Sequence, residues 1–161
     1  MPNHLTPLGI FHTVISILAI IVALIALFHD GKIDPANSLG KWYIALTVVT
    51  CLTSFGIMKT GHFTPAHGLS VLVLVILLIG IYARRIFGRY GNGAQIVAMT
   101  ATLMLSLVPA ITETLTRLPI SSPIAAGPDA PVVKMSNGVL LLVFLLFLSL
   151  QLFKLRKTKR A

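Results

Sequence analysis

The sequence predicts an all-α integral membrane protein whose 161 residues (1–161) form one domain, with five transmembrane helices in a helical bundle. Hydrophobic residues make up 56% of the chain and charged residues only 11%, and the mean hydropathy is +0.93. A water-soluble domain usually carries about 25% charged residues, and a disordered chain needs low hydrophobicity. The charged residues also leave five uncharged stretches, each close to the roughly 20 apolar residues that span a bilayer.

The first two predicted spans are residues 8–28 and 41–58. The first lacks the basic segment and the short apolar core of a signal peptide, so we expect it to be retained as a helix. The second is diluted by Thr and Ser side chains, which favours a place inside the bundle. Ser38 is the residue type expected at the cap that begins this second helix.

The third and fourth predicted spans are residues 65–83 and 93–114. Thr64 followed by Pro65 is a favourable cap and first residue for the third helix. A short turn rich in glycine separates the third span from the fourth. Both spans are therefore bounded by residues that typically end or begin helices.

The fifth predicted span, residues 137–154, follows the longest loop, residues 119–137. That loop is rich in proline, which is typical of extended surface structure. The fifth span is mostly Leu and Phe, so it has few side chains to place in a polar interior. We expect the first four helices to form a four-helix core and the fifth to lie at its periphery.

Basic residues predict the orientation of the chain. Five spans place the two termini on opposite sides, and ten of the 13 Lys and Arg residues then lie on the side of the C-terminus. The positive-inside rule makes that side cytoplasmic. We expect a bacterial inner (cytoplasmic) membrane protein with its N-terminus outside and its C-terminus in the cytoplasm. The basic tail, Lys154 to Arg160, is expected to lie near anionic lipid headgroups rather than to bind nucleic acid.

This topology gathers ionisable residues at the outer ends of the helices. His12 lies early in the first span, His67 lies in the first turn of the third, and Glu113 lies at the end of the fourth. Ionisable groups in membrane helices are functional candidates, so these three are the primary candidates for a ligand site. The secondary candidates share their helix faces or the adjoining outer loop: His62, Ser16, Ser70 and Lys59.

Three chemistries fit this set of residues. The two histidines can be the axial ligands of a b-type haem. His12, His67 and Glu113 can form a two-His, one-carboxylate site for a divalent metal. The same side chains can relay protons or bind a polar substrate at the outer leaflet. The structural alternative is that the histidines are interfacial groups and that Glu113 pairs with Lys59 or Arg117.

Four short segments carry a resemblance to a known family. They are Phe11-His12-Thr13, Gly31-Lys32, Leu39-Gly40-Lys41-Trp42-Tyr43 and Gly61-His62-Phe63-Thr64-Pro65-Ala66-His67. Together they resemble a group of predicted bacterial membrane proteins of unknown function, over residues 10–85. The resemblance implies a small inner-membrane protein in which His12 and His67 matter most, and it implies no established reaction. Members of the group often carry a further His just before the Leu-Gly segment, where this chain has Ala36-Asn37-Ser38.

The expected function is that of a membrane protein with a ligand site and no recognised catalytic motif. The sequence contains no phosphate-binding loop, nucleophile elbow or His-Glu-x-x-His motif. A haem- or metal-binding redox protein is one alternative, and a small transporter or an accessory subunit of a membrane complex is another. The expected partners are the lipid bilayer and either further copies of the chain or other subunits. The single cysteine, Cys51, excludes an internal disulfide and a multi-cysteine metal site within one chain.

Overall fold

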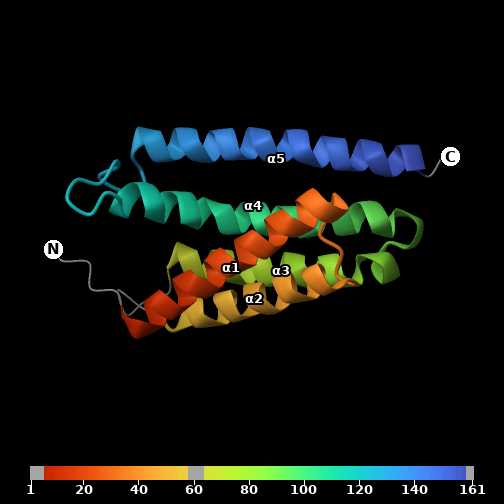
Figure 1. Cartoon of the computed structure of the whole chain (residues 1–161), viewed down its shortest axis with the longest axis horizontal. Helices are drawn as coiled ribbons and strands as arrows, with labels where there is room; N and C mark the ends of the chain where they lie inside the picture. The colour runs from red at the N-terminus through yellow and green to blue at the C-terminus, as the bar shows by residue number, and fades with distance from the viewer. Residues whose placement is uncertain (1–5, 58–63, 159–161) are drawn as a thin grey trace.

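The computed structural model describes residues 6–57 and 64–158. The described residues contain helices and connecting turns, with no strand among them (Figure 1). The elements are α1 (Pro7–Asp30), α2 (Ser38–Phe55), α3 (Pro65–Ile86), the short 3-10 helix η1 (Gly88–Tyr90), α4 (Gly91–Arg117) and α5 (Pro131–Thr158). The predicted all-α helical bundle is therefore confirmed.

Four of the five long helices are long and apolar enough to cross a membrane, namely α1, α3, α4 and α5. These helices support the prediction of a membrane protein. The remaining helix, α2, has 18 residues and includes Lys41 near its start. At 1.5 Å per residue it is about 27 Å long, close to the roughly 30 Å of a hydrocarbon core. That α2 also crosses the membrane stays a prediction.

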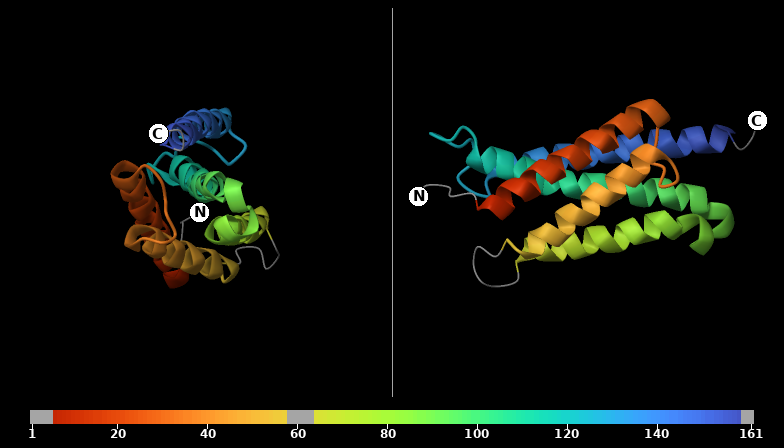
Figure 2. Two further views of the ribbon diagram at one scale, coloured as in Figure 1. Left: turned by 90° about the vertical axis from the view of Figure 1, so that its right-hand side faces the viewer. Right: turned by 60° about the horizontal axis from the view of Figure 1, so that its bottom comes forward.

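The first four helices form the core of the bundle. Within the described residues α1 packs on α2, α2 on α3, α3 on α4, and a smaller contact between α4 and α1 closes the ring (Figure 2). Of the described helices, α5 packs against α4 alone and runs beside it (Figure 1). Only 6% of the apolar window of α5 is buried. The predicted division into a four-helix core and a peripheral C-terminal helix is confirmed.

The helix ends follow from local sequence. Thr6 caps α1, because its hydroxyl accepts a hydrogen bond from the backbone N–H of Gly9 at 3.1 Å. Gly31 ends α1 in the left-handed conformation, with φ of 70°, which glycine adopts without steric cost. Asn37 caps α2 by accepting from the backbone N–H of Gly40 at 2.8 Å. The expectation that Ser38 is the cap was wrong by one residue, because the Asn37 amide oxygen reaches that N–H.

The bounds of α5 also differ from the prediction. The helix begins at Pro131, so the loop that precedes it is shorter than residues 119–137. Proline fits the first turn of a helix because its fixed φ suits the helix and its missing N–H would have no partner there. The proline at this position therefore begins the helix rather than extending the loop.

Small residues let α1 approach the centre of the bundle. Ala23 and Ala26 are buried on the face of α1 that packs into the core. The same core contains Tyr43 of α2, Leu77 of α3 and Met99 of α4, all of which are buried. Membrane helices associate through close packing of small residues, because lipid gives little hydrophobic driving force between helices. The alanine face of α1 therefore determines which side of the helix faces the core.

Asp34 fixes the connection between α1 and α2. Its carboxylate accepts from Lys32 at 2.9 Å and from Arg84, at the end of α3, at 3.2 Å. It also accepts from the backbone N–H of Ala36 at 3.0 Å. Partial burial pushes the pKa of Asp34 upward, but the bonds from Lys32 and Ala36 and the Arg84 charge outweigh burial and hold that pKa below its usual value.

We expect Asp34→Asn to lower the stability of the bundle by about 1 kcal/mol at neutral pH, because it removes a charge shared by two cations. A carboxyl whose pKa is lower in the folded state stabilises the fold above its unfolded-state pKa. That contribution is lost as the pH falls through the folded-state pKa. Thermal unfolding in detergent should therefore show wild type and Asp34→Asn converging in acid. Asp129→Asn is the control, because Asp129 is fully exposed beside Lys134, and its substitution should change little at any pH.

Candidate functional site

The fold brings the predicted site residues to one end of the bundle. The start of α1, the end of α2, the start of α3, the end of α4 and the start of α5 all lie at the left of Figure 1. We name this the outer end, after its predicted side of the membrane. Its polar side chains from α1 to α4 form what we call the outer cluster: His12, Thr53, Ser54, His67, Ser70 and Glu113.

A hydrogen bond from the side chain of His12 joins α1 to α2. Its Nδ1 lies 2.9 Å from the hydroxyl oxygen of Thr53, and the ring also interacts with the backbone of Thr50. The Thr53 hydroxyl donates its own proton to backbone carbonyls of α2, those of Val49 and Thr50, each at 2.9 Å. Which of the two atoms donates depends on the tautomer of the ring. With the proton on Nδ1, the ring donates to Thr53 and Nε2 keeps a lone pair that can accept a proton or a ligand.

Glu113 lies close enough to His12 to act on it electrostatically. Its side chain is 55% exposed and forms an ion pair with Arg117, one turn further along α4. The pairing of Glu113 with Arg117, one of the structural alternatives from the sequence, is therefore observed. The structure thus places Glu113 within electrostatic range of the half-buried imidazole of His12, with its direct ion pair to Arg117.

His67 has a structural role at the start of α3. Its side chain is 2% exposed, and its Nδ1 accepts from the backbone N–H of Thr64 at 2.9 Å. The Thr64 hydroxyl lies 2.8 Å from the same nitrogen. His67 therefore completes a capping box, the reciprocal arrangement that satisfies free N–H groups at a helix start. Its ring also stacks on Phe55 of α2, with centroids 6.0 Å apart.

The secondary candidates bond within or between helices. The hydroxyl of Ser16 donates to backbone carbonyls of its own helix, at 2.8 Å to His12 and 3.0 Å to Thr13. Ser70 accepts from the hydroxyl of Ser54 at 2.8 Å, which joins α2 to α3. The remaining two secondary candidates, Lys59 and His62, lie outside the described residues.

The haem and metal alternatives gain no support from this geometry. Within residues 6–57 and 64–158, no group of three or more His, Cys, Asp or Glu side chains could hold a metal ion. One nitrogen of His67 is already used to cap α3.

Sequence reasoning missed the polar contacts in the interior. Tyr43 and Thr102 bond through their hydroxyls at 2.8 Å in the centre of the bundle. Thr100 donates to Gln151 of α5 at 3.0 Å, and Gln151 donates to the backbone carbonyl of Gly31 at 2.8 Å. The signal for this second network was Gln151 itself, an amide within a helix of Leu and Phe. An amide in lipid needs internal partners.

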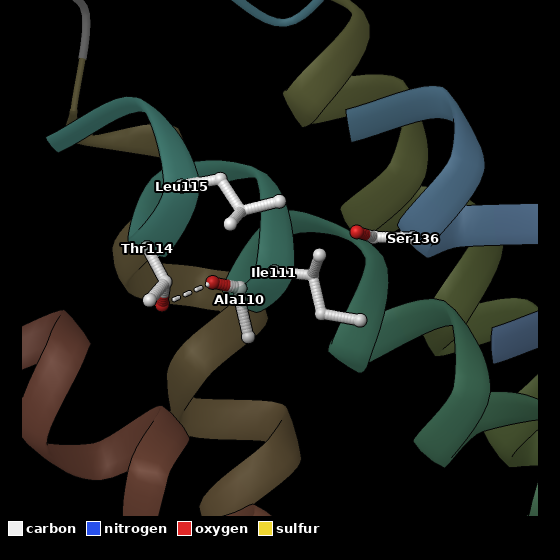
Figure 3. A pocket seen from close by; sticks show the side chains of 5 residues that line it. All are labelled: Ala110, Ile111, Thr114, Leu115 and Ser136. Atoms are coloured by element: carbon white, nitrogen blue, oxygen red, sulfur yellow. Dashed lines mark hydrogen bonds between the residues drawn. The ribbon is translucent and has the colours of Figure 1, made fainter. Parts of the chain in front are cut away.

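A groove of about 380 Å³ lies between α4 and α5 at the outer end (Figure 3). Its mostly apolar lining consists of Ala110, Ile111, Thr114, Leu115 and Ser136. The Thr114 hydroxyl donates to the Ala110 carbonyl of its own helix at 2.7 Å (Figure 3). None of the residues predicted as site candidates lines this groove, so we do not assign the ligand site to it.

Comparisons of the chain with protein-family models, with curated proteins and with solved structures found no match. The fold defines a class, an all-α helical bundle with four helices long and apolar enough to cross a membrane. The resemblance to a family of predicted bacterial membrane proteins stays a prediction.

Proposed function

We propose that this chain is an integral protein of the bacterial inner membrane that binds a small polar ligand on its outer side, at His12. In this proposal the N-terminus lies outside and the C-terminus lies in the cytoplasm. The observation that carries it is the position of His12, a half-buried imidazole bonded to Thr53 of α2, with Glu113 in electrostatic range. An imidazole and a carboxylate in this arrangement can exchange a proton with a ligand or hydrogen-bond to it.

The cost of a polar group in lipid supports a functional role for His12. Further along α1, alanines such as Ala19 and Ala23 pack the same helix into the core, so an alanine at position 12 would also serve packing. Hydrogen bonds between membrane helices contribute only about 0.6 kcal/mol on average. The bond from His12 to Thr53 therefore offers little stability, whereas ionisable residues within membrane spans commonly have functional roles.

We expect His12→Ala to abolish the function of the protein while leaving its fold intact. The measurement is complementation in a bacterial strain that depends on this chain, combined with thermal unfolding of the purified variant in detergent. Thr13→Ala is the matched control, because Thr13 is the next residue of α1, is exposed, and donates its hydroxyl to the carbonyl of Gly9 in the same helix. Full complementation by His12→Ala, equal to that of Thr13→Ala, would contradict the proposal.

A redox protein remains the alternative class with a direct test. It would need His12 and His67 as haem ligands, or His12 with Glu113 and further donors on a metal. An absorbance spectrum and elemental analysis of protein purified from membranes separate the two proposals. A Soret band, or a metal bound in stoichiometric amount, would support the redox protein and contradict the proposal of a polar ligand at His12.

An accessory subunit is favoured by one observation, the exposure of α5. This helix packs on α4 alone among the described helices and leaves most of its surface to lipid or to another subunit. If this protein, extracted from membranes with a mild detergent, runs in a complex whose mass is well above that of the purified chain, that result would support this role. The transporter alternative gains no support, because Tyr43, Leu77 and Met99 fill the centre of the described bundle.

A further inference from the structure

The loop between α4 and α5 carries exposed apolar side chains where a water-facing loop usually carries polar ones. From Leu118 to Pro128 the loop contains no charged residue. Ile120 is 85% exposed and Ile124 is 59% exposed. We call residues 118–124 the apolar tip. Ser121 and Ser122 between the isoleucines are exposed as well, so the tip presents uncharged residues with apolar side chains among them, and exposed large apolar side chains close together can mark an interaction surface.

Backbone hydrogen bonds hold the apolar tip at the end of α4. The N–H of Ala125 donates to the carbonyl of Leu115, in the last turns of α4, at 2.9 Å, and Ile124 donates to Leu118 at 3.2 Å. Ala125 is buried beneath the loop. The loop lies at the outer end of the bundle, next to the ends of α4 and α5 (Figure 1). The isoleucines of the tip are therefore held in place with their side chains pointing away from the protein.

The apolar tip lies beside a surface that already faces lipid. On α5, Met135, Val139 and Leu142 are exposed large apolar residues on a helix apolar enough to span the membrane. The predicted fourth span ends at residue 114, only a few residues before the tip. Charged groups flank the tip on both sides. The ion pair of Glu113 and Arg117 lies at the end of α4, and Asp129, after the tip, is fully exposed and pairs with Lys134. The tip therefore lies at the level where the charged surface begins.

We propose that the apolar tip inserts into the boundary between headgroups and acyl chains of the outer leaflet, with Ile120 and Ile124 in contact with lipid. Apolar side chains near a polar backbone bind that boundary by burying their surface in lipid. The lipid of the surrounding bilayer is the occupant, because the tip continues the lipid-facing surface of α5. The inference rests on the membrane placement in the proposed function, but not on the ligand site.

Tryptophan fluorescence tests the depth of the tip. In a Trp42→Phe background, which removes the only native tryptophan, Ile120→Trp is reconstituted into vesicles of lipids brominated near the headgroup end of the acyl chain. Ile120 is exposed, so the substitution should not disturb the fold. We expect blue-shifted emission that loses most of its intensity to bromine quenching. Emission at the wavelength of water-exposed tryptophan, without quenching, would overturn the proposal.

Two further variants in the same background separate a failure of the tip proposal from a failure of the membrane placement. Leu142→Trp, on the exposed face of α5, should be quenched if the helices span the bilayer, and its failure to quench would contradict the membrane placement itself. Asp129→Trp should stay unquenched, because it reports the water-facing side of the same loop. Blue-shifted but unquenched emission from Ile120→Trp, with Leu142→Trp quenched, would mean that protein rather than lipid covers the tip, and this too would overturn the proposal.

Discussion

Gly40→Ala is expected to prevent the chain from folding stably. A Cβ atom at Gly40 would lie 1.9 Å from the backbone oxygen of Asp34 and 2.5 Å from its carbonyl carbon. The obstacle is backbone rather than the end of a flexible side chain. Relief of the clash would therefore pull Asp34 away from Lys32 and Arg84. Overpacking usually costs about 1–3 kcal/mol, and we expect this substitution to cost more than about 3 kcal/mol.

Gly68→Ala is the matched control for Gly40→Ala. Gly68 lies in α3. Apart from its chain neighbours and the nearby backbone of α3, no described atom lies within 4 Å of a Cβ placed there. Alanine is preferred over glycine inside a helix by about 1 kcal/mol, so this variant should melt at or slightly above the wild-type temperature. The comparison uses thermal unfolding and yield in detergent. Wild-type behaviour of Gly40→Ala would contradict the close approach of α2 to the loop before it.

Gln151→Ala is expected to loosen α5 from the rest of the bundle. Gln151 is buried, accepts from Thr100 of α4 and donates to the carbonyl of Gly31 at the end of α1. Its removal leaves a buried hydroxyl and a carbonyl without these bonds, which costs about 1–3 kcal/mol. Of the described helices, α5 packs only on α4, and Gln151 bonds to α4 and to the residue that ends α1, so the cost falls on the docking of α5. We expect faster proteolysis at the α4–α5 loop and a lower melting temperature.

Ser149→Ala provides the control for Gln151→Ala, since both positions are on α5. Ser149 is exposed and its hydroxyl donates to the carbonyl of Leu145 in its own helix. The alanine variant should resist protease as the wild type does. If both variants are cleaved equally, or neither differs from the wild type, then the bonds of Gln151 do not hold α5.

Hydropathy and charge predicted the number and order of the helices, because each span must satisfy its backbone internally and cover its length with apolar side chains. The start of α5 was not predictable from the density of prolines, since Pro131 can belong to a loop or to a first helical turn. In the sequence, Gly40 stands out only through the resemblance of the Leu39-Gly40-Lys41 segment. The structure explains why a glycine is needed at this position, because α2 approaches the backbone of Asp34 there.

The positions of the candidate residues were predictable in part. Depth in an apolar helix makes His12 a candidate, and the position of Glu113 at the end of its span predicts that it lies at the same end of the bundle. The capping role of His67 could not be predicted, because it follows from the conformation of the chain where α3 begins. That conformation brings the imidazole to the backbone N–H of Thr64. The partner of His12, Thr53, could not be chosen from the several hydroxyl residues of α2, because the rotation of α2 against α1 is set by packing.

The central proposal is that His12 lies near the outer end of a membrane bundle, where a polar ligand can reach it from the outer side. The most direct measurement is labelling of His12→Cys, in a Cys51→Ala background, with a membrane-impermeant maleimide applied to intact spheroplasts. In this background we expect His12→Cys to be labelled from outside and Lys154→Cys to be labelled only after the membrane is opened. In the wild-type protein we expect Cys51, which is buried, to stay unlabelled. Labelling of His12→Cys only from the cytoplasmic side, or not at all in folded protein, would contradict the account.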